Sequence, residues 1–429
     1  MTIALVSLGV SRKDYPYLLN WLYMTPPGIH YARHVLEGAG FGTTVIDKVD
    51  ENLTTAEVID RLREIRPDAV LCNQFFSTRH DVKEICEALP EDAVRGIGGQ
   101  DATFHSISLS DGEFAERYSH ADFVWQGECE KGLSEFLLSF RRGEGPVRVD
   151  NLSRRVTDLD ELPILDHDDY SGEIAFLVTS RGCVSNGCDF CTTPRFYPDG
   201  WRARSVAHVA GELGRIRETG RVHVNVTDDN FLGLTEQDLD RGIQIIAKAR
   251  DVGMKLYPMT SVRQVLRAGE RGILPEWTGT VPKIFLGVEN TVPSALRAIG
   301  KKVHAARHAD ECARAMDLLY EHGISPYLGY INFNPETTSD ELEESAGFLH
   351  RNNSEASNFH YLYNNLGIYE GTRLFDRYKE ERLEMTISGS DYRYTFRHRE
   401  TSVAFAALTF VMDRTQILDF LHFEATHLV

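Results

Sequence analysis

Three cysteines lie within nine residues of one another in the middle of the chain: Cys183, Cys188 and Cys191. Proteins hold iron–sulfur clusters with cysteine thiolates, and Gly182 and Gly187 would let this loop turn its side chains inward. No fourth cysteine lies nearby in the sequence, so a cluster held here would leave one iron open to a substrate. Zinc and unrelated thiols are the alternatives, although zinc sites usually combine two cysteine pairs, or one with a histidine pair.

Polar residues follow several of the predicted strands downstream of the cysteines. Asp228 and Asp229 follow a strand-like segment that ends at Thr227, Glu289 follows one that ends at Val288, and Arg263 comes shortly after a third. In barrel enzymes the active site gathers at the carboxyl ends of the strands. The alternative for the two aspartates is a capping turn, and the alternative for Arg263 is a solvated residue at a helix start.

The elements that precede the cysteines predict a doubly wound domain over residues 1–150. Strand-like and helix-like segments alternate there, which is typical of a parallel sheet covered on both faces. The predicted strands are Thr2 to Leu8, Gly42 to Ile46, Ala69 to Phe75, Val94 to Gly98 and Phe123 to Gln126. The predicted helices include His30 to Glu37, Thr54 to Ile65 and Arg79 to Leu89. Such sheets bind ligands beyond the carboxyl ends of their strands, where this chain has Asn73, Gly98, Gly99 and Gly127.

A second alternating series follows an acidic, irregular stretch that we predict to be a linker, residues 151–170. Its predicted strands are Ile174 to Ser180, Val222 to Thr227, Lys255 to Thr260, Lys283 to Val288, Ser325 to Phe333 and His360 to Leu366. Six such units predict a partial barrel over residues 171–375. Residues 376–429, which begin with basic and aromatic side chains, are predicted to form a small cap. The expected fold class is therefore α/β, with a Rossmann-like sheet, a partial (β/α)6 barrel and a C-terminal cap.

Length and charge narrow the classes of function. A chain of 429 residues is too long for one ordinary core. Its 64 acidic and 46 basic residues give a net charge of −18, which would repel a phosphate backbone, so a nucleic acid is an unlikely partner. The longest apolar runs fall short of the about 20 residues that span a bilayer, and the N-terminus lacks a basic signal region. We therefore expect a cytoplasmic protein that does not cross a membrane.

The cysteine segment resembles the signature of the radical S-adenosylmethionine superfamily, in the branch (class B) whose members carry a cobalamin-binding domain in front. That family usually has three residues between its first two cysteines, whereas this chain has four. The sequences on either side of the cysteines are nevertheless similar to those of members of that branch, at Thr179-Ser180-Arg181-Gly182 and Trp201-Arg202-Ala203-Arg204-Ser205. The resemblance implies that the three cysteines hold a 4Fe-4S cluster whose open iron binds S-adenosylmethionine, and that reductive cleavage of this cofactor yields a 5'-deoxyadenosyl radical.

The same resemblance implies roles for the other candidate residues. Phe190 would pack near the adenine of S-adenosylmethionine, and Asp228 and Asp229 would receive its amino group. Glu289 would lie near the ribose or the substrate, and Arg263 would pair with the methionine carboxylate.

The first 150 residues are similar to the cobalamin-binding domain of that branch. The cobalt-ligating motif Asp-x-His-x-x-Gly is absent from the sequence, so the resemblance implies a cobalt without a histidine from the protein. Loops at Asn73, Gly98, Gly99 and Gly127 would approach the corrin. A flavodoxin-like domain that binds nothing is the alternative.

As a whole, the resemblance implies an enzyme that methylates an unactivated carbon of a small-molecule, natural-product-type substrate, with a reductant such as flavodoxin or ferredoxin as its partner. One alternative is a radical enzyme that does not methylate but catalyses cyclisation, rearrangement or oxidation. A second alternative is a metal-stabilised binding or sensor protein, which would not cleave S-adenosylmethionine. The sequence assigns neither the substrate nor a catalytic proton or hydrogen donor.

Overall fold

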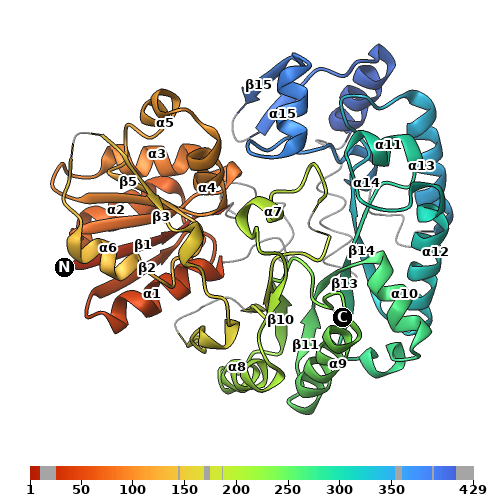
Figure 1. Cartoon of the computed structure of the whole chain (residues 1–429), viewed down its shortest axis with the longest axis horizontal. Coiled ribbons are helices and arrows are strands. Elements are labelled where there is room, and N and C mark those ends of the chain that lie inside the picture. The colour runs from red at the N-terminus through yellow and green to blue at the C-terminus, as the bar shows by residue number, and fades with distance from the viewer. Residues whose placement is uncertain are drawn as a thin grey trace. The chain divides into compact units, whose positions relative to one another are not determined.

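The computed structural model describes residues 1–9, 26–143, 145–168, 174–185, 187–352, 360–388 and 391–411 (Figure 1). The chain divides into two compact units. One contains Met1–Leu177, Arg202–Gly220 and Ser388–Asp391, and the other contains Val178–Trp201, Arg221–Ile387 and Tyr392–Val429. The domain boundaries expected near residues 150, 170 and 375 remain predictions.

The first unit is built on a parallel sheet with the strand order β2-β1-β3-β4-β5-β6. All five predicted strands are present: β1 (Thr2–Ser7), β2 (Gly42–Asp47), β3 (Ala69–Asn73), β4 (Val94–Gly98) and β5 (Phe123–Gln126). The edge strand β6 (Val147–Asp150) was not predicted. None of its four residues is fully buried, so it lacks the apolar pattern that marks the strands inside the sheet.

Helices cover both faces of this sheet because successive side chains of each strand point to opposite faces. Ala4 and Val6 of β1 enter a core with α2 (Thr55–Ile65) and α3 (Arg79–Ala88). Ile3 and Leu5 enter a second core with α1 (Pro27–Gly38) and α6 (Leu133–Ser139). Two further helices, α4 (Gln100–Ser108) and α5 (Asp111–Arg117), come between β4 and β5 along the chain. The expected capping box at the start of α2 is present, because Thr54 accepts from the N–H of Glu57.

Two ion pairs inside the first unit involve residues of the segment Arg202–Gly220. Arg202 binds Glu128 at 2.5 Å, and both side chains are nearly inaccessible. Arg204 binds Glu212 of α8 (Val206–Glu218) at 2.6 Å, and neither side chain is exposed at all. A buried charge is costly without its partner. The pair Arg202–Glu128 therefore ties the segment to the rest of the first unit, and the pair Arg204–Glu212 holds the start of the segment to its own helix α8.

The second unit contains two groups of parallel strands. In one group β10 (His223–Val226) pairs with β11 (Lys255–Tyr257). In the other, β13 (Lys283–Glu289) lies between β12 (Met259–Ser261) and β14 (Ser325–Tyr330). The predicted strand Lys255 to Thr260 is split at Pro258, whose nitrogen carries no hydrogen for a ladder bond.

The sixth predicted strand of the barrel, His360 to Leu366, is wrong. Residues His360–Tyr363 form the short helix α14, and only Asn365 makes an isolated parallel bridge, with Phe333. A short apolar segment does not distinguish a strand from a buried helical turn by its pattern alone. Here the hydroxyl of Tyr361 accepts a hydrogen bond from the N–H of Leu328, which holds the helical turn against β14.

The helices of the second unit follow its strands: α9 (Glu236–Asp251), α10 (Val262–Glu270), α12 (Ala305–Glu321) and α13 (Ser339–Asn352) (Figure 1). Side chains alternate along β13, where Ile284, Leu286 and Val288 are fully buried. Phe285, Gly287 and Glu289, on the opposite face of the strand, are only partly buried. This second face is therefore the one that can receive ligands.

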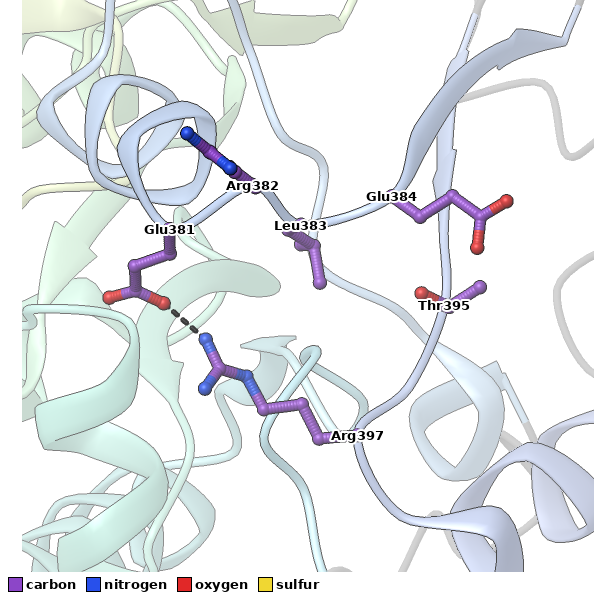
Figure 2. Close-up of a pocket in the computed structure, with 6 residues that line it drawn as sticks. All are labelled: Glu381, Arg382, Leu383, Glu384, Thr395 and Arg397. Carbon is purple, nitrogen blue, oxygen red and sulfur yellow. Dashed lines mark hydrogen bonds and ion pairs between the residues drawn. The ribbon is translucent and has the colours of Figure 1, made fainter.

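The C-terminal segment contains α15 (Arg373–Glu380), β15 (Met385–Ser388), β16 (Asp391–Tyr394) and a helix at 399–411. Two of its aromatic side chains, Phe396 and Phe405, are partly buried and make edge contacts with the buried ring of Phe333. A shallow pocket of about 550 Å³ opens among the six residues of Figure 2, where Arg397 is paired with Glu381. In the described part of the chain, no helix has the length and apolarity needed to cross a membrane.

Candidate functional site

The cysteine loop begins where β8 (Ser180–Arg181) ends and continues to α7 (Thr193–Phe196). Gly182 turns the chain with a φ of 84°, a conformation that favours glycine. Cys188 is buried, Cys183 and Cys191 are half-buried, and none of the three forms a disulfide. The N–H of Cys191 donates to the carbonyl of Cys188 at 3.3 Å, which makes a tight turn between the last two thiols.

The three thiols are close enough to influence one another. Burial, together with negative charge on Cys191, Asp229 and Cys188, raises the pKa of Cys183 to about 11. Burial also raises the pKa of Cys191. An iron ligand must be a thiolate, so loading this loop would release protons.

Asp229 holds the two ends of the cysteine loop together. One of its carboxylate oxygens accepts from the N–H of Gly182 at 3.2 Å, and the other accepts from the hydroxyl of Thr193 at 2.9 Å. Gly182 precedes the first cysteine and Thr193 follows the last. Burial raises the pKa of Asp229, while these two hydrogen bonds favour its charged form.

Asp228 anchors the chain just before the loop. Its carboxylate is fully buried and accepts from the N–H of Thr179 at 2.7 Å and from the hydroxyl of Ser180 at 2.7 Å. Asn230 adds a third tie, since its carbonyl accepts from the indole N–H of Trp201 at 2.7 Å. The motif at residues 228–230 therefore fixes segments on both sides of the cysteines.

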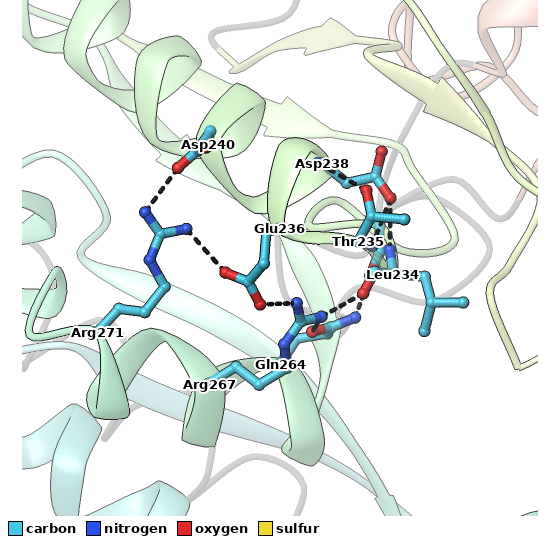
Figure 3. Close-up of polar contacts among 9 residues, drawn as sticks. Leu234, Thr235, Glu236, Asp238, Asp240, Gln264, Arg267 and Arg271 are labelled. Atoms are coloured by element: carbon cyan, nitrogen blue, oxygen red, sulfur yellow. Dashed lines mark hydrogen bonds and ion pairs between the residues drawn. The ribbon is translucent and has the colours of Figure 1, made fainter.

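The far end of the 228–235 loop is held by polar contacts between α9 and α10, which Figure 3 shows. Gln264 donates to the carbonyl of Gly233, and Arg267 donates to the carbonyl of Leu234. Asp238 accepts from the N–H of Leu234 at 2.9 Å and from that of Thr235 at 2.7 Å, and Thr235 caps α9 by accepting from the N–H of Asp238. The position of the aspartates is thus defined at both ends of their loop.

A second anchor reaches the cysteine loop from the segment after β13. The N–H of Asp189, between the second and third cysteines, donates to the carbonyl of Gly300 at 3.2 Å. The next residue, Lys301, binds Glu289 at 3.1 Å, and both side chains are largely buried. Glu289 was a candidate from the sequence, whereas Lys301 was missed, because its only sequence signal was a basic pair after a turn.

The remaining candidates of the second unit are Phe190, which directly follows Asp189, and Arg263 of α10. Phe190 packs against an apolar cluster that includes Ile299, Leu366 and Leu374. Arg263 is exposed in the first turn of α10. Their expected contacts with S-adenosylmethionine remain predictions.

The four cobalamin candidates of the first unit share one edge of its sheet. The carbonyl of Gly98 accepts from the N–H of Gln74 at 2.7 Å, which joins the loops after β3 and β4. The N–H of Gly127, after β5, donates to the hydroxyl of Thr103 at 3.0 Å, and that hydroxyl donates to the carbonyl of Gly99 at 2.8 Å.

Contacts within the protein already explain why two of these residues, Asn73 and Gly99, are found at this edge. The side chain of Asn73 accepts from the N–H of Leu8 at 2.6 Å and donates to its carbonyl at 3.3 Å. At Gly99, whose φ is 104°, a Cβ would lie 2.7 Å from the carbonyl oxygen of Gln74. These residues shape the edge whether or not a ligand binds there.

The donor set suits a cluster. Across the described residues, no three His, Cys, Asp or Glu side chains are arranged to hold a single metal ion. In a 4Fe-4S cluster each cysteine binds a different iron, so its ligands need not converge on one point. Three free, neighbouring thiols on a braced loop fit this requirement. Buried side-chain oxygens of Asn230, in the loop after β10, and of Thr260, within β12, have no hydrogen-bond partner within the described residues and could receive a polar ligand.

Comparison with known proteins connects these features to characterised enzymes. No protein-family model matches the chain. The chain is 24% identical to cytidylyl-2-hydroxyethylphosphonate methyltransferase of Streptomyces wedmorensis, over 75% of this chain and 74% of the relative. It is 26% identical to hopanoid C-3 methylase of Methylococcus capsulatus, over 70% of this chain and 61% of the relative. The chain therefore spans less than two thirds of the second relative.

Solved structures with the same fold include two cobalamin enzymes. The cobalamin-dependent S-adenosylmethionine radical enzyme OxsB, with aqua-cobalamin bound, matches with a TM-score of 0.71 and 18% identity, over 96% of this chain and 67% of OxsB. The radical S-adenosylmethionine methyltransferase TsrM from Kitasatospora setae, with cobalamin and a 4Fe-4S cluster bound, matches with a TM-score of 0.66 and 14% identity, over 90% of this chain and 81% of TsrM. The chain is a homologue of the methyltransferases named above and has the fold of cobalamin-dependent radical S-adenosylmethionine enzymes.

Proposed function

We propose that this protein is a cobalamin-dependent radical S-adenosylmethionine enzyme that methylates an unactivated carbon of a small molecule. The observation that carries the proposal is the cysteine loop: three free thiols, braced by Asp228 and Asp229, in a chain whose relatives are methyltransferases. When bound, the cluster with S-adenosylmethionine would supply a 5'-deoxyadenosyl radical, and cobalamin would supply a transferable methyl group.

The residues of the second unit would orient these groups. Cys183, Cys188 and Cys191 would ligate three irons and leave the fourth open for the amino and carboxylate groups of S-adenosylmethionine. Asp229 would keep the ends of the loop together during loading, because it bonds to residues on both sides of the cysteines. Glu289, on the partly exposed face of β13, supports a contact with the ribose or the substrate. Phe190 would present its ring to the adenine.

The edge of the first unit would bind cobalamin. The loops that contain Asn73, Gly98, Gly99 and Gly127 adjoin one another after β3, β4 and β5, and three of these four residues are glycines. Residues without a Cβ allow a flat ring to approach the backbone closely. The structural neighbours support this assignment, since OxsB and TsrM have been solved with cobalamin.

The substrate and the electron donor follow from the class of reaction. TsrM has been solved with tryptophan as its substrate, and we propose a small molecule of natural-product type for this protein too. A low-potential donor such as flavodoxin or ferredoxin would reduce the cluster. A cytoplasmic location suits the seven cysteines, because thiols stay reduced there.

The test is anaerobic reconstitution with iron and sulfide, followed by incubation with S-adenosylmethionine and a reductant. The wild-type protein should bind about four irons and release 5'-deoxyadenosine. Cys183→Ala, Cys188→Ala and Cys191→Ala should each lose most of the iron and all of this product, because two thiolates do not retain the cluster. Cys129→Ala, at a half-buried cysteine in the first unit, is the matched control and should behave as the wild type.

Unchanged iron content and 5'-deoxyadenosine release in any of the three loop variants would contradict the cluster assignment. Methylation is tested separately, by mass analysis of candidate substrates with and without methylcobalamin. A product that forms without cobalamin and gains no methyl group would identify a radical enzyme of another type.

A further inference from the structure

A buried ion pair lies at the end of β13, on the face of the strand that can receive ligands. The ammonium of Lys301 is 3.1 Å from Glu289 Oε1 and 3.3 Å from the carbonyl oxygen of Gly287. The side chain of Lys301 is 12% exposed and that of Glu289 is 16% exposed. A lysine pays a large desolvation cost at such a position, so its location needs an explanation beyond surface charge.

Gly287 leaves part of the space that this pair occupies. A Cβ at Gly287 would lie 3.2 Å from Glu289 Oε1 and 3.6 Å from Lys301 Nζ. In the neighbouring strand β14, a Cβ at Gly329 would lie 2.6 Å from the ring of Phe285, so this glycine makes room for Phe285 on the same face of β13. Glu289 itself has a φ of 67°, which a glutamate rarely adopts. Strained backbone of this kind is common at functional sites, where it fixes the direction of a side chain.

The same segment is attached to the cysteine loop. Gly300, with a φ of 66°, accepts from the N–H of Asp189 at 3.2 Å, and its missing Cβ makes room for the Asp189 side chain. Lys302 adds an ion pair with Asp189 at 3.4 Å. Because Asp189 follows Cys188 directly and Gly300 precedes Lys301, the backbone next to Lys301 is bonded to the backbone next to the second cysteine.

The surroundings of Lys301 act on its pKa in opposite directions. Burial by itself lowers the pKa of Lys301, but attraction to Glu289, Cys188 and Cys183 outweighs it, so the pKa lies above its usual value. The ammonium is therefore a cation that Glu289 holds in the segment bonded to the cysteine loop. Lys301 has three N–H donors, of which the pair with Glu289 and Gly287 employs two.

We infer that Lys301 is a positioning residue that sets the reduction potential of the cluster. This inference rests on the proposed function, because it assumes that the three cysteines hold a 4Fe-4S cluster. Reduction adds one negative charge to a group that three thiolates already make negative, and the electron comes from the low-potential donor. A buried cation nearby stabilises the reduced form, and nearby charge is one of the factors that tune such clusters. Glu289 fixes the ammonium in place and partly offsets its charge.

The test is a redox titration of the reconstituted protein without S-adenosylmethionine, followed by electron paramagnetic resonance of the reduced cluster. Lys301→Met removes the cation but keeps most of the side-chain volume. We expect the equilibrium between reduced and oxidised cluster to fall at least about tenfold, which is 59 mV toward more negative potential for one electron. Lys301→Arg should restore most of the wild-type potential because the positive charge returns.

Two further variants control for charge in general and for loss of folding. Lys302→Met removes a neighbouring lysine that is half exposed, and solvent screening should leave the potential nearly unchanged. Glu289→Gln keeps Lys301 but removes the offsetting anion, so the potential should move in the positive direction. Opposite shifts for Lys301→Met and Glu289→Gln would not follow from simple damage to the loop.

The outcomes separate this inference from the proposed function. If the wild-type protein assembles no cluster, the proposed function fails and the inference fails with it. If the wild type assembles a cluster and Lys301→Met has an unchanged or more positive potential, the inference is wrong while the proposed function stands. If Lys301→Met holds no cluster, the Glu289→Gln shift decides, and a negative or absent shift overturns the inference.

Discussion

Asp229 uses both of its carboxylate oxygens inside the protein, one with Gly182 and the other with Thr193. Asp229→Asn keeps the shape of the side chain but replaces one acceptor by a donor, so one of these bonds is lost. A buried bond of this kind contributes about 1 to 3 kcal/mol. We therefore expect a reconstituted cluster that is lost faster to an iron chelator, with Thr193→Val weakened in the same direction.

The role implied by the family resemblance leads to a different result for the same variant. If Asp229 mainly receives the amino group of S-adenosylmethionine, Asp229→Asn should keep a stable cluster and lose affinity for the cofactor, while Thr193→Val should leave that affinity unchanged. The rate of cluster loss and the affinity for S-adenosylmethionine, measured on both variants, distinguish the two roles.

Single residues were predictable where their chemistry is local in the sequence. The three cysteines and the two aspartates stand out by type and spacing. Thr193 and Lys301 do not, because their importance arises from contacts with residues distant in the sequence. Thr193 bonds to Asp229, and the residue before Lys301, Gly300, bonds to Asp189. For Asn73, the sequence predicted the position at a strand end but not the contacts of the side chain, which bonds to the backbone of Leu8.

At the scale of elements, the two kinds of ion pair in this protein should differ in their contribution to stability. Arg271 bridges Glu236 and Asp240 on the surface between α9 and α10, as Figure 3 shows. Such exposed pairs contribute little to stability because solvent screens them. Arg204 and Glu212 are completely buried, and removing one partner of such a pair costs about 3 to 5 kcal/mol.

Urea denaturation checks this difference. Arg271→Ala should leave the unfolding midpoint of the second unit almost unchanged, whereas Arg204→Met should lower that of the first unit strongly. The double variant Arg204→Met with Glu212→Met should recover part of the loss, because no charge then stays buried without a partner. Equal effects of Arg271→Ala and Arg204→Met would show that burial does not determine the contribution of these pairs.

Most elements were predictable because strands inside a parallel sheet are short, apolar and bounded by turns. Prediction failed where tertiary contacts decide between two conformations. The edge strand β6 is too polar to be recognised, Pro258 interrupts a strand whose apolar pattern continues, and Tyr361 stabilises a helical turn in a segment that reads as a strand.

At the scale of the whole molecule, the chain should bind one cobalamin without a histidine of its own on the cobalt. His105 lies in α4, directly after the Gly98 and Gly99 turn. Its Nδ1 is 2.7 Å from the hydroxyl of Tyr118, and its Nε2 is 3.3 Å from Arg117. Both ring nitrogens are thus engaged, so we expect His105→Gln to retain cobalamin with an unchanged absorption and electron paramagnetic resonance spectrum.

The measurement is cobalt content after anaerobic reconstitution and desalting, together with spectra that show the dimethylbenzimidazole tail off the cobalt. A protein that keeps its iron–sulfur cluster but no cobalt would rule out methyl transfer through cobalamin. A spectrum that changes in His105→Gln would instead identify a histidine ligand.

The ion pair between Glu128 and Arg202 has a consequence for synthesis on the ribosome. Glu128 belongs to the early part of the first unit, but its buried carboxylate meets its guanidinium partner only after residue 202 has been translated. The three cysteines therefore leave the ribosome before the first unit is complete. Iron delivered during translation would meet a nascent chain whose first unit still lacks the segment Arg202–Gly220, so the order of synthesis favours loading of the cluster after that segment has been made.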